Sequence, residues 1–133
     1  MRGLKVSAWE RRLKTVFDQI DAELENEYGG RYELHPARPP RGKTANPEDD
    51  GLFNVGAAFS AGFGSKYGPG YVVDIRIATL EKVPAKVREK IKHKVVKKLK
   101  RRLPDAFPGK ILHVAEEPNG TIRIHGDLSL DSI

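Results

Sequence analysis

Apolar residues recur at every third or fourth position in two separate stretches of the chain, which predicts two amphipathic helices. The first stretch follows Ser7, which matches a capping box with Glu10, and the Gly29-Gly30 pair ends it. The second stretch, residues 84–103, begins with a proline and is closed by Pro104. The apolar positions of the two stretches are Trp9, Leu13, Val16, Phe17, Ile20, Leu24, Val87, Ile91, Val95, Val96, Leu99 and Leu103.

Alternation of apolar with small or polar residues predicts two longer strands, over residues 53–63 and 71–77. A glycine-rich turn joins them into a hairpin with one apolar face and one face of small and polar side chains. Because both helices need an apolar surface to cover, this apolar face is their expected partner. Further short strands are expected over residues 2–6 and 32–35.

Two more short strands, residues 111–115 and 121–125, are expected on either side of Pro118-Asn119-Gly120. That tripeptide is typical of a type I turn closed by a left-handed glycine. A three-residue loop aligns the apolar residues of both strands on one face. It also places His113 opposite His125 on the other face.

Together the elements predict an α+β fold, a two-layer sandwich with two helices packed on one face of a mainly antiparallel sheet of four to six strands. The 133 residues have the length of one domain, so residues 1–133 are expected to form a single unit. Residues 36–51 are rich in proline and glycine and are expected to form a long loop. The opposite sheet face is then either open or covered by this loop.

Composition narrows the range of chemistry. The chain has no cysteine, which excludes disulfides, thiolate metal sites and cysteine nucleophiles. No apolar run approaches the ~20 residues of a membrane span, and the first residues do not resemble a signal peptide, so a cytoplasmic protein is expected. No cofactor is expected either, because the glycine-rich residues 62–70 lead into a strand, whereas a phosphate loop leads into a helix.

Charge is distributed unevenly along the chain. The 24 Lys and Arg exceed the 18 Asp and Glu by six. Residues 82–102 hold eleven basic residues and one acid, a formal charge of +10, and the rest of the chain carries −4. Such asymmetry indicates a surface that meets an anionic partner.

On a helix, the basic residues of this segment fall opposite the apolar stripe. Like charges four residues apart destabilise an isolated helix by about 0.2–0.5 kcal/mol per pair, so several such pairs favour a partner that neutralises them, as phosphate backbones do. We therefore expect a non-enzymatic module that binds RNA or a ribonucleoprotein. The predicted contacts are Lys86, Lys90, Lys94, Lys97, Lys100 and Arg101, with Arg38, Arg41 and Lys43 of the long loop as secondary contacts.

Other interpretations of these charges are open. The lysines could form an ordinary solvated face, and the loop arginines could pair with Glu48-Asp49-Asp50. The basic stripe could instead meet an acidic protein surface, including the acidic half of another copy's first helix, which would give a homo-oligomer. An anionic membrane surface is less favoured, because the apolar stripe of this helix lacks Trp and Phe and has a use against the sheet.

Three weaker signals lie outside the basic segment. His113 and His125 are candidate metal ligands, although two histidines are an incomplete zinc site. Asp74 and Arg76 share a strand face and would form the site of a small enzyme, the third functional hypothesis, although an ion pair is the commoner role. Tyr67, at the tip of the glycine-rich turn, could stack on an unpaired base.

The order of helix, strands and helix resembles that of the double-stranded RNA-binding domain. The resemblance covers element order alone, because that family's helix-opening basic motif has no match at residues 81–88 and the final hairpin has no counterpart. It therefore implies no contact residues for this chain.

Overall fold

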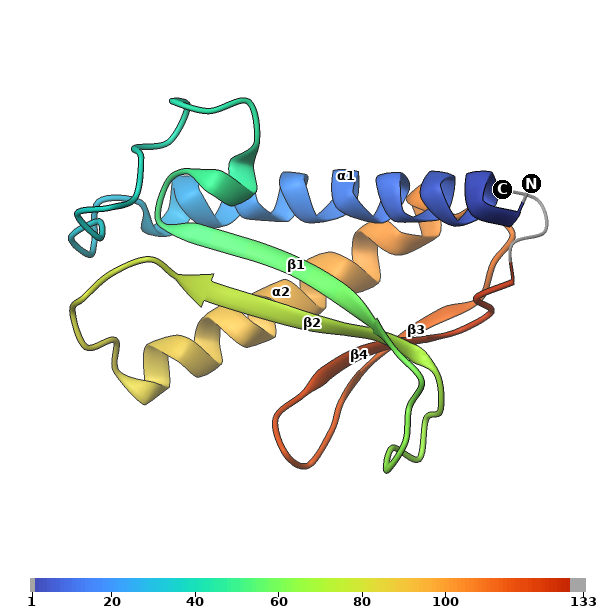
Figure 1. Ribbon diagram of the computed structural model, residues 1–133. Coiled ribbons are helices and arrows are strands. Elements are labelled where there is room, and N and C mark those ends of the chain that lie inside the picture. Colours follow the sequence, from blue (N-terminus) through green and yellow to red (C-terminus); the bar gives the residue numbers. More distant parts are fainter. Residues whose placement is uncertain (1, 130–133) are drawn as a thin grey trace.

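The computed structural model describes residues 2–129, with side chains from residue 7 onward. Helices and strands follow one another as α1 Arg2–Tyr28, η1 Pro47–Asp49, β1 Phe53–Ser60, β2 Gly70–Ile77, α2 Ala85–Ala106, β3 Leu112–Glu116 and β4 Ile122–Gly126 (Figure 1). The strands form one antiparallel sheet in the order β1-β2-β4-β3. This part of the chain contains no helix that is long and apolar enough to cross a membrane.

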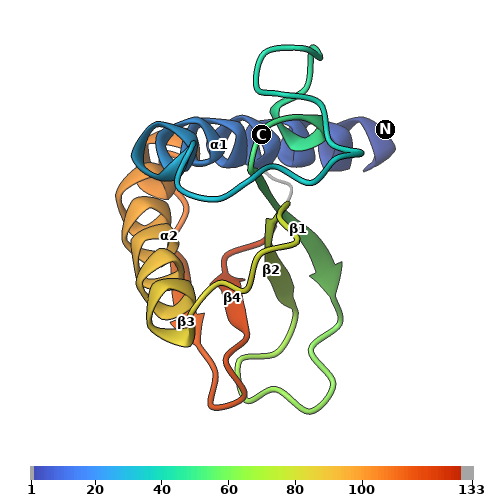
Figure 2. The same ribbon diagram turned by 90° about the vertical axis from the view of Figure 1, so that its left-hand side faces the viewer.

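Both helices lie on one side of the sheet, which confirms the predicted two-layer α+β arrangement. α1 packs against β1, α2 packs against β3, and the two helices contact each other (Figure 2). At the junction, the Trp9 ring stacks on Phe107 and Tyr71, with centroid distances of 4.2 and 5.4 Å. These rings join α1, β2 and the chain that leaves α2, so they hold the layers together.

The first hairpin pairs β1 and β2 along their whole length, as predicted, but β1 ends at Ser60 rather than at residue 63. Gly62 has a left-handed φ of 86°, and its backbone passes too close to that of Gly68 to accommodate a side chain. The glycines therefore turn the chain sharply and leave Phe63 almost fully exposed.

The prediction for the N-terminus is wrong. α1 begins at Arg2, so residues 2–6 form no strand and Ser7 does not cap the helix. Arginine, leucine and lysine before Ser7 are good helix formers, and serine inside a helix costs only a fraction of a kcal/mol. The capping-box match was therefore too weak a signal to fix the start of the helix.

Residues 32–35 also form no strand. The segment lies beside the end of β2, where His35 N–H donates to Ala78 O at 2.8 Å and the Thr79 hydroxyl donates to Glu33 O at 2.6 Å. Isolated bonds of this kind fix the chain without a strand ladder, which needs an alternating series of backbone pairs.

α2 extends three residues beyond the predicted boundary at Leu103 and passes through Pro104 to Ala106. Proline removes one backbone donor, yet Phe107 N–H still donates to Leu103 O at 2.9 Å. Burial of the Phe107 ring against Trp9 compensates for the missing bond.

The second hairpin has the predicted three-residue loop register, and His113 lies opposite His125. The long loop includes η1 and packs on α1 and on the edge strand β1 (Figure 1). It therefore does not cover the outer face of the sheet, where Ala58, Asp74 and His113 are exposed.

Candidate nucleic-acid interface

α2 directs its apolar side into the protein, and its buried residues are Ile91, Val95, Val96, Leu99 and Leu103. With about 100° between successive residues, the basic side chains fall on two flanks, one beside α1 and one facing away. The two flanks differ in whether acidic groups neutralise them.

The flank beside α1 is an ion-paired seam, formed by Lys94, Lys98 and Arg102 of α2 and by Glu23 and Glu27 of α1. Lys94 Nζ lies 2.5 Å from Glu27, and Lys98 Nζ lies 2.5 Å from Glu23 and 3.0 Å from Glu27. Arg102 also pairs with Glu23. The hydrogen bond from Lys94 lowers the pKa of Glu27, which favours its ionised form, and the two acids of the seam neutralise two of its three cations.

The other flank carries lysines that meet no acid within 4.0 Å among residues 7–129. We call this surface the free basic face; it consists of Lys86, Lys90, Lys97 and Lys100. The four lie within an arc of about 80° and span about 21 Å of helix at 1.5 Å per residue. Arg101 lies at its border, 69% exposed and 3.8 Å from Glu23. Four of the six lysines and arginines predicted on α2 therefore lie together on the free basic face, and Arg101 lies at its border. Lys94 instead belongs to the seam.

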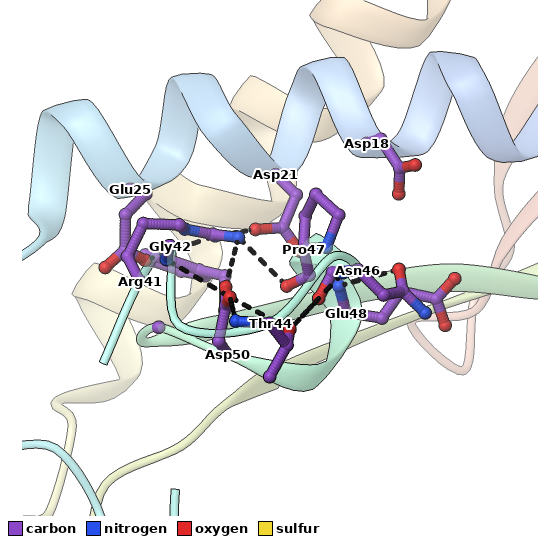
Figure 3. A network of polar contacts seen from close by, with 12 residues as sticks. Asp18, Asp21, Glu25, Arg41, Gly42, Thr44, Asn46, Pro47, Glu48 and Asp50 are labelled. Carbon is purple, nitrogen blue, oxygen red and sulfur yellow. Dashed lines mark hydrogen bonds and ion pairs between the residues drawn. The ribbon is translucent and has the colours of Figure 1, made fainter. Parts of the chain in front are cut away.

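The two loop arginines that were predicted as secondary phosphate contacts are used inside the protein. Arg41 pairs with Asp21 and lies 3.0 Å from Asp50 and 3.4 Å from Glu25 (Figure 3). Arg38 donates hydrogen bonds of 2.6 to 3.0 Å to four backbone carbonyls, of Glu48, Asp50, Gly51 and Phe53. The Arg41–Asp50 pair agrees with the alternative in which these arginines pair with Glu48-Asp49-Asp50, whereas the pairs with Asp21 and Glu25 of α1 were not anticipated. Lys43 is exposed.

Two buried carboxylates of this network respond differently to their surroundings. Burial raises the pKa of Asp21 to about 6, although Arg41 and the Val55 N–H act in the opposite direction. Burial would also raise the pKa of Asp50, but hydrogen bonds from Thr44 and the charge of Arg41 outweigh it and lower that pKa. The network fastens the long loop to α1 and β1, so its chemistry is structural.

The outer face of the sheet carries the remaining candidates. His113 and His125 lie side by side, with ring centroids 5.2 Å apart, and residues 2–129 contain no group of three or more His, Cys, Asp or Glu side chains placed to hold a metal ion. Asp74 and Arg76 form an exposed ion pair of 3.1 Å. His113 borders a small hollow at the edge of β3.

Sequence reasoning missed both the seam and the role of Arg41, but each had a signal. Glu23 and Glu27 are four residues apart, as are Lys94 and Lys98, which suits two facing helices. Asp21 stands among the apolar positions of α1, and a charged group on a buried stripe needs a partner.

Comparison with known proteins places the chain in a family. A family model described as "Uncharacterised protein" matches residues 4–126, so the chain belongs to that family. It is 38% identical over 115 residues to a Borreliella burgdorferi protein described as "Uncharacterized protein", an alignment that covers 86% of this chain and 90% of that one. No solved structure matches the chain.

Proposed function

We propose that the protein is a non-enzymatic module that binds RNA, or the RNA of a ribonucleoprotein, through the free basic face of α2. One observation carries the proposal. The acids of α1 neutralise one flank of α2, whereas the four lysines of the free basic face have no acidic partner among residues 7–129. Repulsion among these lysines is relieved when a phosphate backbone replaces their counterions.

The number of free lysines sets the expected salt dependence. Four phosphate contacts give a slope of log K against log salt of about −2.8 for single strands and −3.6 for duplexes. Affinity should therefore fall about 50- to 150-fold between 50 and 200 mM salt. Sequence preference should be weak, because phosphate contacts carry no base information.

The test compares two double variants with the same change in charge. Lys90→Glu with Lys97→Glu reverses two lysines of the free basic face, and Arg11→Glu with Arg31→Glu reverses two exposed arginines of and just after α1. Fluorescence anisotropy with a labelled RNA should give a lower affinity and a salt slope reduced by about 1.4–1.8 for the lysine variant alone. Equal binding by both variants would refute the proposal.

An acidic protein surface is the second candidate partner, and a second copy of the chain is its simplest form. In that version the acidic half of α1 would meet the basic face of another copy, but Glu23 and Glu27 already pair within their own chain. Size-exclusion chromatography of nucleic-acid-free protein at 50 and 500 mM salt tests it. Salt-sensitive self-association would favour this candidate over RNA.

A further inference from the structure

Three planar side chains form a ladder across the outer face of the sheet. Tyr67, from the turn between β1 and β2, lies 4.6 Å from His125 of β4, and His125 lies 5.2 Å from His113 of β3. Each pair is tilted by 31°. Lys66 Nζ lies 5.1 Å from the Tyr67 centroid and covers that end. The other end of the ladder is the exposed His113, on the edge strand β3.

A small hollow lies where the ladder reaches the edge of the sheet. Its volume is about 290 Å³, and it is lined by Lys100, Leu103, Pro104, Leu112, His113 and Val114. It thus joins the end of α2 to β3 and brings together His113, aliphatic residues and one lysine. None of these six residues is acidic.

The backbone of β3 adds hydrogen-bonding groups to this hollow. Asp127 N–H donates to Ile111 O, and Glu117 N–H donates to Thr121 O. Along an edge strand of an antiparallel sheet, the backbone N–H and C=O groups of successive residues point alternately toward the neighbouring strand and away from it. The two bonds show that the odd-numbered residues of β3 direct these groups toward β4. The N–H and C=O of Val114 therefore face the free edge, where a planar ligand beside His113 can reach a donor and an acceptor.

Electrostatics connect the hollow to the free basic face. Lys100 belongs to both, so when the free basic face holds the phosphate of a nucleotide, the base of that nucleotide lies next to the hollow. Burial lowers the pKa of His125, and the nearby His113 and Arg123 lower it further. The lowered pKa favours the neutral form of the middle ring, and a base that stacks on His113 extends the ladder.

We propose that this hollow binds the base of an unpaired nucleotide, stacked on the outer face of the His113 ring, while the adjoining phosphates lie along Lys97 and Lys100. The inference rests on the proposed function and narrows its substrate to single-stranded RNA. A paired base cannot turn into the hollow, because its faces are covered by its neighbours in the duplex.

The test uses a 12-nucleotide single-stranded RNA that carries 2-aminopurine at its centre, and the duplex of the same sequence. His113→Ala should weaken binding of the single strand about tenfold and abolish the quenching of 2-aminopurine, while binding of the duplex stays within twofold. His113→Phe keeps a ring and should restore both signals. Ile111→Ala, at an exposed site next to β3, is the matched control and should behave as wild type.

Two outcomes separate this inference from the function on which it rests. If Lys90→Glu with Lys97→Glu weakens binding but His113→Ala binds both RNAs as wild type does, the base site is refuted and the basic face stands. If the lysine variant binds as wild type does, both proposals fail. Circular dichroism spectra that match wild type show that the exposed His113 can be replaced without unfolding. If His113→Ala is folded and binds weakly, and His113→Phe does not restore binding, stacking on residue 113 is also refuted.

Discussion

Replacing Arg41 tests the role of the buried network most directly. In Arg41→Ala, Asp50 keeps hydrogen bonds from the Gly42 and Thr44 backbone and from the Thr44 hydroxyl, at 3.0 to 3.1 Å. Asp21 keeps one, from Val55 N–H at 3.3 Å, and its side chain is only 1% exposed. Both carboxylates lose their counterion, but Asp21 is the one left buried with a single hydrogen bond.

The expected loss of stability follows from the buried Asp21 carboxylate, which has lost its ion-pair partner. Removing one partner of a buried ion pair costs about 3–5 kcal/mol. For a chain of this length, such a loss lowers the melting temperature by about 10–20 °C. Protonation of Asp21 offers partial relief, so the cost should be smaller at pH 5 than at pH 7.5.

Urea unfolding followed by circular dichroism measures the loss. Lys43→Ala, in the same loop but exposed, is the control and should stay within about 0.5 kcal/mol of wild type. Adding Asp21→Asn to Arg41→Ala removes the stranded charge and should recover part of the stability. A loss below about 1 kcal/mol for Arg41→Ala, or one no larger than that of Lys43→Ala, would refute the reasoning. RNA affinity of the folded Arg41→Ala protein should stay within twofold of wild type.

Two further predictions concern pH and the two flanks of α2. Asp21 has a folded pKa of about 6 against an ordinary value of 3.8, so its protonation stabilises the fold as the pH falls through 6, and this contribution is lost as the pH rises. Between pH 5 and 7.5, urea unfolding should therefore show a smaller loss of stability for Asp21→Asn than for wild type; identical pH profiles would contradict the raised pKa. Lys98→Ala breaks the seam and should cost about 1 kcal/mol of stability, whereas Lys97→Ala should leave the melting temperature unchanged and reduce the salt slope of RNA binding by about 0.7–0.9. Equal stability of the two variants in thermal melts would contradict the distinction between the flanks.

Most of the fold was predictable because periodicity is a strong local signal. The alternation that begins at Phe53 and the four-residue steps from Val87 to Leu103 each specify one element and the face it buries. The turn around Gly120 specified the register of the second hairpin, including His113 opposite His125. Element ends were less predictable, since burial of Phe107 carried α2 past Pro104.

The candidate site was predictable only in part, for a different physical reason. Periodicity assigns Lys94 and Lys97 to the same polar side of α2, yet only Lys94 faces the acids of α1. Which lysine is neutralised depends on how the two helices pack, and a pattern within one helix carries no such information. Likewise, an arginine in a long loop has the same local sequence signal whether it reaches solvent or, like Arg41, a buried carboxylate.

The seam between α1 and α2 also shapes the electric field at a distance. Because the acids of the seam neutralise most of its cations, the exposed excess of positive charge is concentrated on the free basic face, and charge gathered on one side of a molecule creates a dipole. A dipole turns in the field of an approaching polyanion before the surfaces touch, so more encounters begin with α2 facing the ligand. The association rate constant should therefore carry most of the salt dependence, with dissociation changing little.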